Sequence, residues 1–355
     1  RRAERVTPMR LLPAGALLGA LVLAPSSAAA VSGAATSAPF SLPEEPKALT
    51  RSTSHPEMAS FLRSVDGKGP VSVAVEGKSR EGRDLFVVRL SRGGAPRWRL
   101  LFYAQQHGDE VSGKDALLYL IRDAARDPET LPADVELRVV PMVNPDGAEA
   151  GTRRNGAKAD LNRDHVTLEE PETRALHRVF RTYRPHLAVD AHEFVRDPEE
   201  WRRRGLVKWT DITMDGLCNP LFAPELVSAA LRHVDEAAAA EARAGYRFLR
   251  YWVGGVPPRD EQRHSAPDLD GGLNAAGAYG ALSFIIEAAV TRAGGRPEAD
   301  LGRRVDAYLV LFRRFLSKEA RPDSDLAAIA AARRRPLPAF LPPNDFWANA
   351  GGRVP

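Results

Sequence analysis

The 355-residue sequence alternates between short apolar runs and longer stretches with helical periodicity, and this alternation constrains its fold most strongly. Apolar runs separated by helical patterns predict an α/β fold in which helices cover a central sheet. We expect strands at residues 71–75, 85–90, 98–104, 135–143, 186–190 and 282–286. We expect helices at residues 110–124, 169–183, 223–243 and 301–317.

The composition is that of a globular chain with few options for binding a metal. Hydrophobic residues make up 44% of the chain and charged residues 27%, which argues against a disordered or multi-span membrane protein. The single cysteine, Cys218, excludes an internal disulfide and a cysteine-rich zinc module, so a metal would need histidine and carboxylate ligands. The formal net charge of +4 owes much to residues 1–30. Because the sequence has no basic stripe with interleaved aromatic residues, we expect no nucleic-acid partner.

Residues 1–30 have the features of a secretory signal. An arginine-rich start is followed by an apolar stretch at residues 11–24 and by small residues at 26–30. We therefore expect cleavage near Ala30, no stable membrane insertion after the signal is removed, and a mature protein that is secreted or held at the cell envelope. The apolar stretch is shorter than the roughly 20 residues of a spanning helix. An uncleaved N-terminal anchor is the alternative.

Ionisable residues gather where the expected strands end, which is where ligand sites form in open α/β sheets. The strand at 98–104 runs into His107 and Glu110, with Gly108 between them to permit a tight turn. The spacing of three puts both side chains on the same side if the next helix has begun. Taken alone, such a pair is more typical of helix capping and surface roles than of a metal site.

Two further strand ends carry candidate residues. His192 follows the strand expected at 186–190, whereas His186 at its start would be about 20 Å away and cannot serve the same site. Glu287 follows the strand expected at 282–286. A carboxylate next to a buried apolar strand needs an ion-pair or hydrogen-bond partner, or its pKa is shifted. Glu287 is therefore a candidate general base. A structural histidine and an arginine-paired carboxylate are the alternatives at these positions.

Together these strand ends supply the residue types of a catalytic zinc site. Such a site usually has two histidines and one carboxylate, a fourth position open to water, and a second glutamate that takes the proton of this water. A downstream loop adds Arg153, Asn162 and Arg163. A planar guanidinium there could grip a carboxylate, and the amide could donate to it. A solvated turn is the alternative for this loop.

In this order, the motifs resemble those of the zinc metallocarboxypeptidase family, which contains the pancreatic carboxypeptidases and many secreted bacterial proteins. The matching segments span roughly residues 70–290 and are Gly77-Lys78-Ser79-Arg80-Glu81-Gly82-Arg83, His107-Gly108-Asp109-Glu110, Asn144-Pro145-Asp146-Gly147, Asp160-Leu161-Asn162-Arg163, Asp190-Ala191-His192 and Phe284-Ile285-Ile286-Glu287. The resemblance implies an α/β fold consisting of a single domain, with a central mixed sheet of about eight strands flanked by helices.

The resemblance also implies a role for each matching residue. The zinc ligands, for one ion per chain, would be His107, Glu110 and His192. Glu287 would be the general base that takes a proton from zinc-bound water, and Arg153 would stabilise the oxyanion. Asn162 and Arg163 would hold the free C-terminal carboxylate of a peptide substrate, so the enzyme would remove the last residue of the peptide.

The expected organisation of the chain follows from these segments. We expect a signal peptide at 1–30, a Ser/Ala/Pro-rich linker at 31–53, a zinc carboxypeptidase-like catalytic domain at 54–334 and a Pro-rich C-terminal tail at 335–355.

The substrate preference is less constrained than the chemistry. The substrate-binding tyrosine of the family has no counterpart at the usual spacing, because Tyr279 lies too near Glu287 and Tyr251 too far from it. Asp268 and Asp270 lie near where the family lines its side-chain pocket, and an acid there would attract Lys, Arg or a diamino acid. A plain turn is the alternative for these two residues.

Two other functions remain open from the sequence. One is an amidohydrolase that removes acyl groups from amino acids or acts on cell-wall peptides, since related deacylases share the His-x-x-Glu pair and a later histidine. The other is a binding module that still binds zinc or a substrate carboxylate but catalyses no reaction. The loop at 144–163 favours the peptidase, and an intact Glu287 argues against the silent module.

Overall fold

The computed structural model describes residues 41–256, 260, 262–291 and 300–334. The predicted signal peptide, the linker as far as residue 40 and the predicted tail at 335–355 lie outside the described residues. Within the described part of the chain, no helix is both long enough and apolar enough to span a bilayer.

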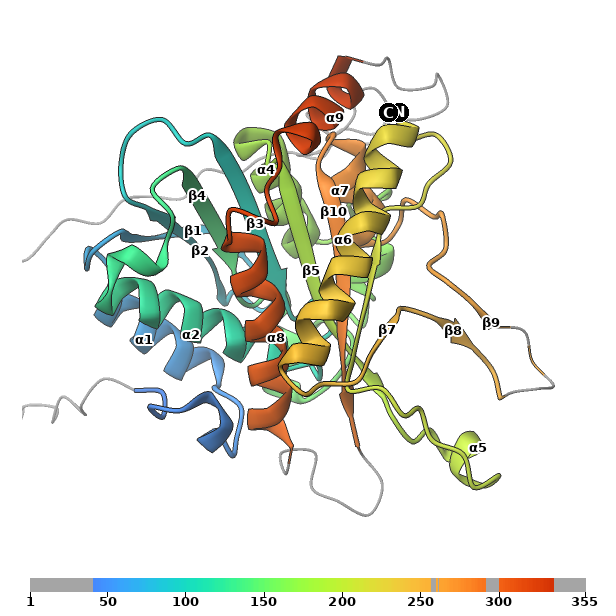
Figure 1. Ribbon diagram of the computed structural model, residues 1–355. Coiled ribbons are helices and arrows are strands. Elements are labelled where there is room, and N and C mark those ends of the chain that lie inside the picture. The colour runs from blue at the N-terminus through green and yellow to red at the C-terminus, as the bar shows by residue number, and fades with distance from the viewer. Residues whose placement is uncertain (1–40, 257–259, 261, 292–299, 335–355) are drawn as a thin grey trace, which may run out of the picture. The chain divides into compact units, whose positions relative to one another are not determined.

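A single mixed sheet of eight strands, in the order β1-β2-β4-β3-β5-β10-β6-β7, forms the centre of the fold (Figure 1). Its strands are β1 (Val71–Lys78), β2 (Asp84–Ser91), β3 (Trp98–Ala104), β4 (Val135–Val140), β5 (Leu187–Val195), β6 (Ile212–Gly216), β7 (Phe248–Arg250) and β10 (Leu282–Val290). The central strands β4, β3, β5 and β10 are parallel to one another, whereas β1, β2 and β6 pair antiparallel with their inner neighbours. The predicted α/β fold with a mixed sheet of about eight strands is confirmed.

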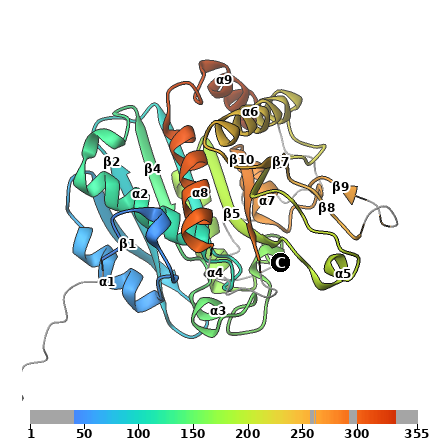
Figure 2. The same cartoon turned by 60° about the horizontal axis from the view of Figure 1, so that its bottom comes forward.

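Helices cover both faces of this sheet (Figure 1 and Figure 2). The α-helices of the described residues are α1 (His55–Val65), α2 (Ser112–Arg126), α3 (Pro145–Ala150), α4 (Pro171–Tyr183), α5 (Glu199–Arg202), α6 (Pro224–Arg243), α7 (Gly272–Ala278), α8 (Leu301–Leu316) and α9 (Asp323–Arg334). Helices α2, α6 and α8 pack on one face, while α4 and α7 pack on the other. The four predicted helices correspond to α2, α4, α6 and α8, with ends that differ by at most two residues.

Alternate side chains of β3 enter two separate hydrophobic cores. Leu100 and Phe102 belong to the core under α2 and α8, and Leu101 and Tyr103 belong to the core under α4. Because both faces of the strand are covered, every one of these side chains is buried. This explains why the central strands are continuous apolar runs in the sequence and have no alternating polar face.

The strands that carry His192 and Glu287 extend further than the sequence predicted. β5 continues to Val195 and β10 to Val290, so both residues lie within strands and not after them. The two strands pair in parallel, with Glu287 directly opposite His192. Conversely, β4 ends at Val140, three residues before the end of its predicted run.

The prediction of a linker as far as residue 53 is wrong for residues 41–53, which pack onto the domain. Leu42 and Leu49 are buried in the main hydrophobic core. The Nζ of Lys114, itself fully buried on α2, donates a hydrogen bond of 2.8 Å to Ser52 Oγ. Two apolar anchors and a buried lysine thus fix a segment whose average composition resembles a linker.

Glu241 on α6 carries a buried carboxyl group that lacks hydrogen-bond partners among the described residues. Its side chain is fully shielded from solvent, and among the described residues neither carboxylate oxygen has a hydrogen-bond partner. Burial, together with the nearby carboxylates of Asp306 and Asp211, raises the pKa of Glu241 to about 9. The acid is therefore protonated in the folded protein at neutral pH, whereas the unfolded chain ionises it above about pH 4.5.

This difference in pKa makes stability fall with rising pH. Between about pH 5 and 8 the unfolded chain releases a proton that the folded protein keeps, so Glu241 lowers the free energy of unfolding by up to about 1.4 kcal/mol per pH unit. We expect Glu241→Gln, which is close to isosteric and does not ionise, to be more stable than the wild type by an amount that grows with pH. Denaturant unfolding of both proteins at about pH 5, 6.5 and 8 measures this difference, and a constant difference would contradict the assignment.

Candidate metal centre and active site

The predicted site residues converge on one cavity at the carboxyl ends of β3, β5 and β10. The cavity has a volume of about 360 Å³. Its lining includes His107, Glu110, Arg153, Asn162, Arg163, Tyr251, Arg263, Asp268, Asp270 and Glu287. His192 lies directly against Glu110 at this wall, so all seven candidate residues from the sequence lie at one site.

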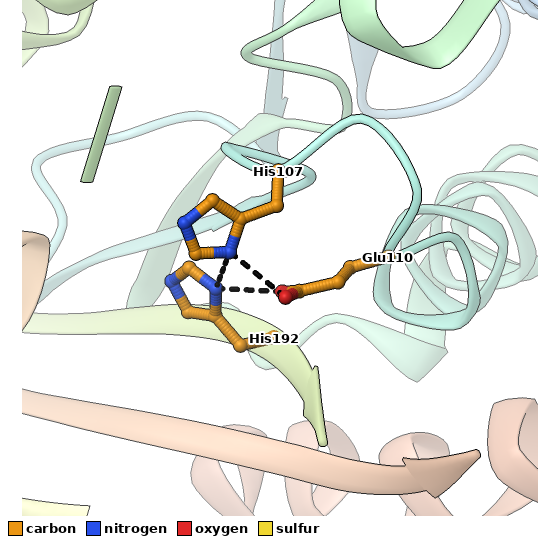
Figure 3. A group of neighbouring side chains, drawn as sticks. All are labelled: His107, Glu110 and His192. Carbon is orange, nitrogen blue, oxygen red and sulfur yellow. Dashed lines mark hydrogen bonds and ion pairs between the residues drawn. The ribbon is translucent and has the colours of Figure 1, made fainter. Parts of the chain in front are cut away.

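His107, Glu110 and His192 form a compact group of potential metal ligands (Figure 3). The Nδ1 atom of His107 lies 2.8 Å from one carboxylate oxygen of Glu110, and the Nδ1 atom of His192 lies 2.8 Å from the other. The two Nδ1 atoms are 3.1 Å apart. Two imidazole nitrogens and a carboxylate oxygen this close together match the donor types and the ligand spacing of a tetrahedral zinc site.

Opposite charges within the group set its protonation. Burial by itself would raise the pKa of Glu110, but His107 and His192 lower it below its ordinary value. Burial would likewise lower the pKa of both histidines, yet their carboxylate neighbours raise it. The carboxylates thus favour protonated histidines, and because a metal ion binds the unprotonated nitrogens, metal binding would release protons.

A second carboxylate holds the far side of each histidine ring. The Nε2 atom of His107 lies 3.1 Å from Asp160 Oδ1, and the Nε2 atom of His192 lies 3.0 Å from Asp190 Oδ2. Such partners fix the orientation of a metal-binding imidazole and leave its other nitrogen free for the ion. The sequence placed both aspartates in matching motifs, but nothing in their spacing showed that they contact the histidines.

A tight loop between β3 and α2 positions His107 and Glu110. The backbone of Gln105 adopts a positive φ of 58°, and its Nε2 donates a hydrogen bond of 2.8 Å to the carbonyl of Gly108. A Cβ atom on Gly108 would lie 2.0 Å from the backbone of Gly147, so only glycine fits there. Helix α2 begins at Ser112, so both candidate ligands lie in the loop and not on the helix. The condition that the helix has already begun at this pair is therefore not met, and the loop aligns the two side chains.

Glu287 faces the same cavity from β10. Its place opposite His192 in the β5–β10 register brings it next to the metal group. Burial raises the pKa of Glu287 to about 7, with His192 opposing this rise and Glu110 adding to it. A carboxyl group with a pKa near neutral can exchange a proton at physiological pH, as a general base must.

The loop residues predicted to bind substrate also lie at this cavity. Arg153 Nη1 lies 3.5 Å from Glu110 Oε1, and its Nη2 lies 3.0 Å from Asp160 Oδ2. Asn162 Oδ1 accepts a 2.7 Å hydrogen bond from the backbone of Gly272, which fixes the amide beside the metal group. The side chain of Arg163 is 59% exposed in the cavity.

The structure resolves the position of the two tyrosines that the sequence could not assign. Tyr251 lines the cavity, whereas the Tyr279 hydroxyl is buried 2.9 Å from His177 Nδ1. Tyr251 seemed too distant in sequence because an excursion containing β8 (Val253–Gly254) and β9 (Gln262–Arg263) separates it from the rest of the site. Tyr251 therefore lies at the cavity despite its distance from Glu287 in the sequence.

The two aspartates considered for specificity also line the cavity. Asp268 and Asp270 belong to the loop before α7, and Asp270 Oδ2 lies 3.9 Å from Arg163 Nε. The loop is therefore part of the cavity wall, and its carboxylates give that wall negative charge.

The mixed sheet carries a His/Glu/His group at the edge of its parallel strands, with a glutamate next to it, and this arrangement suits a metal-dependent α/β protein. Residues 58–196 match the model of the zinc carboxypeptidase family. This segment contains all three candidate metal ligands together with Arg153, Asn162 and Arg163. Over this segment, which is less than half of the chain, the sequence is therefore similar to the zinc carboxypeptidase family.

The chain is also similar to individual proteins. A metallo-carboxypeptidase from Pseudomonas aeruginosa, solved in complex with (2-guanidinoethylmercapto)succinic acid, is 25% identical, with a TM-score of 0.57 over 76% of this chain and 70% of that one. The carboxypeptidase A from Helicoverpa armigera has the same fold, with 18% identity and a TM-score of 0.60 over 82% of this chain and 78% of that one. Carboxypeptidase 2 from Trichophyton tonsurans is 26% identical over 257 residues, which are 67% of this chain and 46% of that protein. The chain spans about half the length of the curated relatives it matches.

Zinc should stabilise the folded protein through the three-residue group. At a zinc concentration about a thousandfold above the dissociation constant, we expect roughly 4 kcal/mol of added stability and a higher melting temperature. Glu110→Gln should lose most of this shift, because it removes the only anionic ligand. Thermal unfolding with zinc and with a chelator measures the effect.

Asp268→Asn is a matched control for this experiment, since it neutralises a carboxylate elsewhere in the same cavity wall. It should keep the zinc shift of the wild type. An undiminished shift in Glu110→Gln would contradict the assignment of the ligands.

Proposed function

We propose that the protein is a secreted zinc carboxypeptidase that hydrolyses the C-terminal peptide bond of peptides, with one zinc ion per chain. The observation that carries this proposal is a single cavity that unites the metal-ligand group, the partly buried Glu287 and the two arginines Arg153 and Arg163. The proposal of secretion rests on the sequence of residues 1–30 alone.

The proposed chemistry divides between the metal and two side chains. The zinc ion would supply Lewis acidity, which polarises a carbonyl and lowers the pKa of a water molecule. Glu287 accepts the proton of the attacking water and later returns it to the departing amine, a task that suits its pKa of about 7. Arg153, beside Glu110 at 3.5 Å, donates hydrogen bonds to the oxygen on which negative charge develops.

Asn162 and Arg163 provide the reason to propose an exopeptidase. The planar guanidinium of Arg163 can bind a carboxylate through two hydrogen bonds, and its exposure leaves it accessible in the cavity. Asn162 Nδ2 lies 3.4 Å from His192 Nε2, so the residues that would bind the substrate carboxylate lie close to the candidate metal ligands. A substrate held by its terminal carboxylate would present its last peptide bond, and no inner bond, to Glu287.

A mixed peptide pool tests this proposal directly. We expect the zinc-loaded protein to remove single residues from peptide C-termini, and Glu287→Gln to lose at least about a hundredfold in rate, because general-base catalysis contributes that much or more. Mass spectrometry of the pool identifies each released residue. The carboxylates of Asp268 and Asp270 in the wall favour release of Lys and Arg over acidic residues.

The same pool supplies the control and the contrary result. Peptides with amidated C-termini lack the carboxylate that Arg163 would bind, so they should be cleaved far more slowly than their free-acid counterparts. An unchanged pool with the zinc-loaded wild type would contradict the peptidase proposal and favour acylated amino acids as substrates.

The pH profile provides an independent test of Glu287 as the base. Lys208 lies among three aromatic rings, 5.1 Å from that of Trp252 and 5.3 Å from that of Phe194, and its positive charge lowers the pKa of Glu287. A base must be unprotonated, so kcat/KM is lost as the pH falls through its pKa. Lys208→Met removes the charge, and we expect the acidic limb of the kcat/KM profile to move to higher pH by roughly a few tenths of a unit.

Lys208→Arg keeps the charge and the contact with the aromatic rings, so it is the matched control and should leave the limb in place. A limb that stays fixed in Lys208→Met, or that moves to lower pH, would show that Glu287 does not set it.

A further inference from the structure

A chain of buried polar side chains extends from His192 away from the cavity. Asp190 Oδ2, which lies 3.0 Å from His192 Nε2, also accepts a hydrogen bond of 2.7 Å from Gln106 Nε2. Both Asp190 and Gln106 are fully buried. A Cβ atom on Gly272 would lie 2.4 Å from Asp190 Oδ2 and 2.7 Å from Gln106 Nε2, so the start of α7 closes over this pair.

The chain continues through two histidines to a tyrosine. Gln106 Oε1 lies 2.7 Å from His165 Nε2, His165 Nδ1 lies 2.9 Å from His177 Nε2, and His177 Nδ1 lies 2.9 Å from the hydroxyl of Tyr279. His165 follows the short 3-10 helix at Leu161–Arg163, His177 lies on α4 and Tyr279 follows α7. The six side chains therefore connect the metal group to the helical layer formed by α4 and α7. The metal-binding scheme proposed above makes no use of the four beyond Asp190.

The chemistry of the groups gives this chain a single direction. Asp190 Oδ2 accepts from the amide NH₂ of Gln106, so the oxygen of the same amide faces His165. His165 must then carry its proton on Nε2 and present a bare Nδ1, which requires a donor on His177 Nε2. By the same step, His177 Nδ1 is bare and accepts from the Tyr279 hydroxyl.

Both inner histidines are suited to this role. Burial lowers the pKa of His165 to about 4, and it lowers the pKa of His177 well below its ordinary value. Each ring is therefore neutral near pH 7, with one donor nitrogen and one acceptor nitrogen. Every hydrogen bond in this series is therefore donated in the direction of Asp190, and His192 can keep its own proton on Nε2.

We infer that Gln106, His165, His177 and Tyr279 are positioning residues, which act through Asp190 to hold His192 with its proton on Nε2 and its Nδ1 bare for the metal. The inference rests on the proposed role of His192 as a zinc ligand. Its consequence is that a change at His165, which lies outside the cavity lining, weakens metal binding without removing a ligand.

The tautomers of the wild-type protein test the direction of the chain. Nitrogen-15 shifts of the imidazole rings in the full zinc-loaded protein distinguish a protonated Nε2 from a protonated Nδ1. We expect His165, His177 and His192 all to be protonated on Nε2. A proton on Nδ1 of His165 or His177 would overturn the inference, and this measurement needs no variant to fold.

Zinc affinity, measured by competition with a chelator, tests the consequence. We expect His165→Leu, which removes the donor to Gln106, to bind zinc roughly tenfold more weakly, at the lower end of the effect of removing an outer partner of a metal ligand. His165→Gln can place an amide NH₂ near the position of Nε2, and it should restore the affinity to within about twofold of the wild type. A purely structural role would predict loss of stability in both variants with unchanged zinc affinity.

His233→Leu is the matched control. His233 is also fully buried, and its Nε2 lies 2.8 Å from Asp325 Oδ2, but it does not belong to the series of hydrogen-bonded side chains that leads to His192. It should lower the melting temperature and leave the zinc affinity unchanged. Wild-type zinc affinity in a folded His165→Leu protein would overturn the inference. A wild type that binds zinc but cleaves no peptide would overturn the proposed activity and leave this inference standing.

Discussion

The parallel pairing of β3, β5 and β10 is the constraint on which the rest of the site depends. Parallel strands end at the same edge of a sheet, so residues far apart in the sequence meet there. The register places Glu287 opposite His192, and β3 leads into the loop that holds His107 and Glu110. Parallel strands need both faces covered, which ties the site to the two helical layers and to the two hydrophobic cores between them.

The fold could be predicted from the sequence where an element is long and periodic, and it could not where tertiary contacts decide. The four predicted helices have apolar stripes that face the sheet, and the central strands are uninterrupted apolar runs. Strand β6 was not expected, because it is five residues long and contains Asp215, whose burial depends on a 2.8 Å contact with Arg250. Helix α7 consists largely of glycine and alanine, so its pattern shows no stripe, and it forms against β5 and β10.

The gathering of the candidate residues could be predicted from the sequence, because local motifs place them at strand ends and in one loop. The spacing between His107 and Glu110 is fixed by one loop, and His192 is fixed by its place on a strand. The outer partners could not be found in this way, since Asp190 and His165 meet through Gln106, which follows a different strand. Burial was equally invisible in the sequence, and burial is what raises the pKa of Glu287 to about 7.

We propose that His107, Glu110 and His192 bind one zinc ion through the two Nδ1 atoms and the carboxylate. Anomalous diffraction from crystals of the zinc-loaded protein, recorded on both sides of the zinc absorption edge, tests it most directly. We expect one strong peak about 2.0–2.2 Å from both Nδ1 atoms and from an oxygen of Glu110. The absence of a peak, or a zinc ion bound through Nε2 of either histidine, would contradict the account.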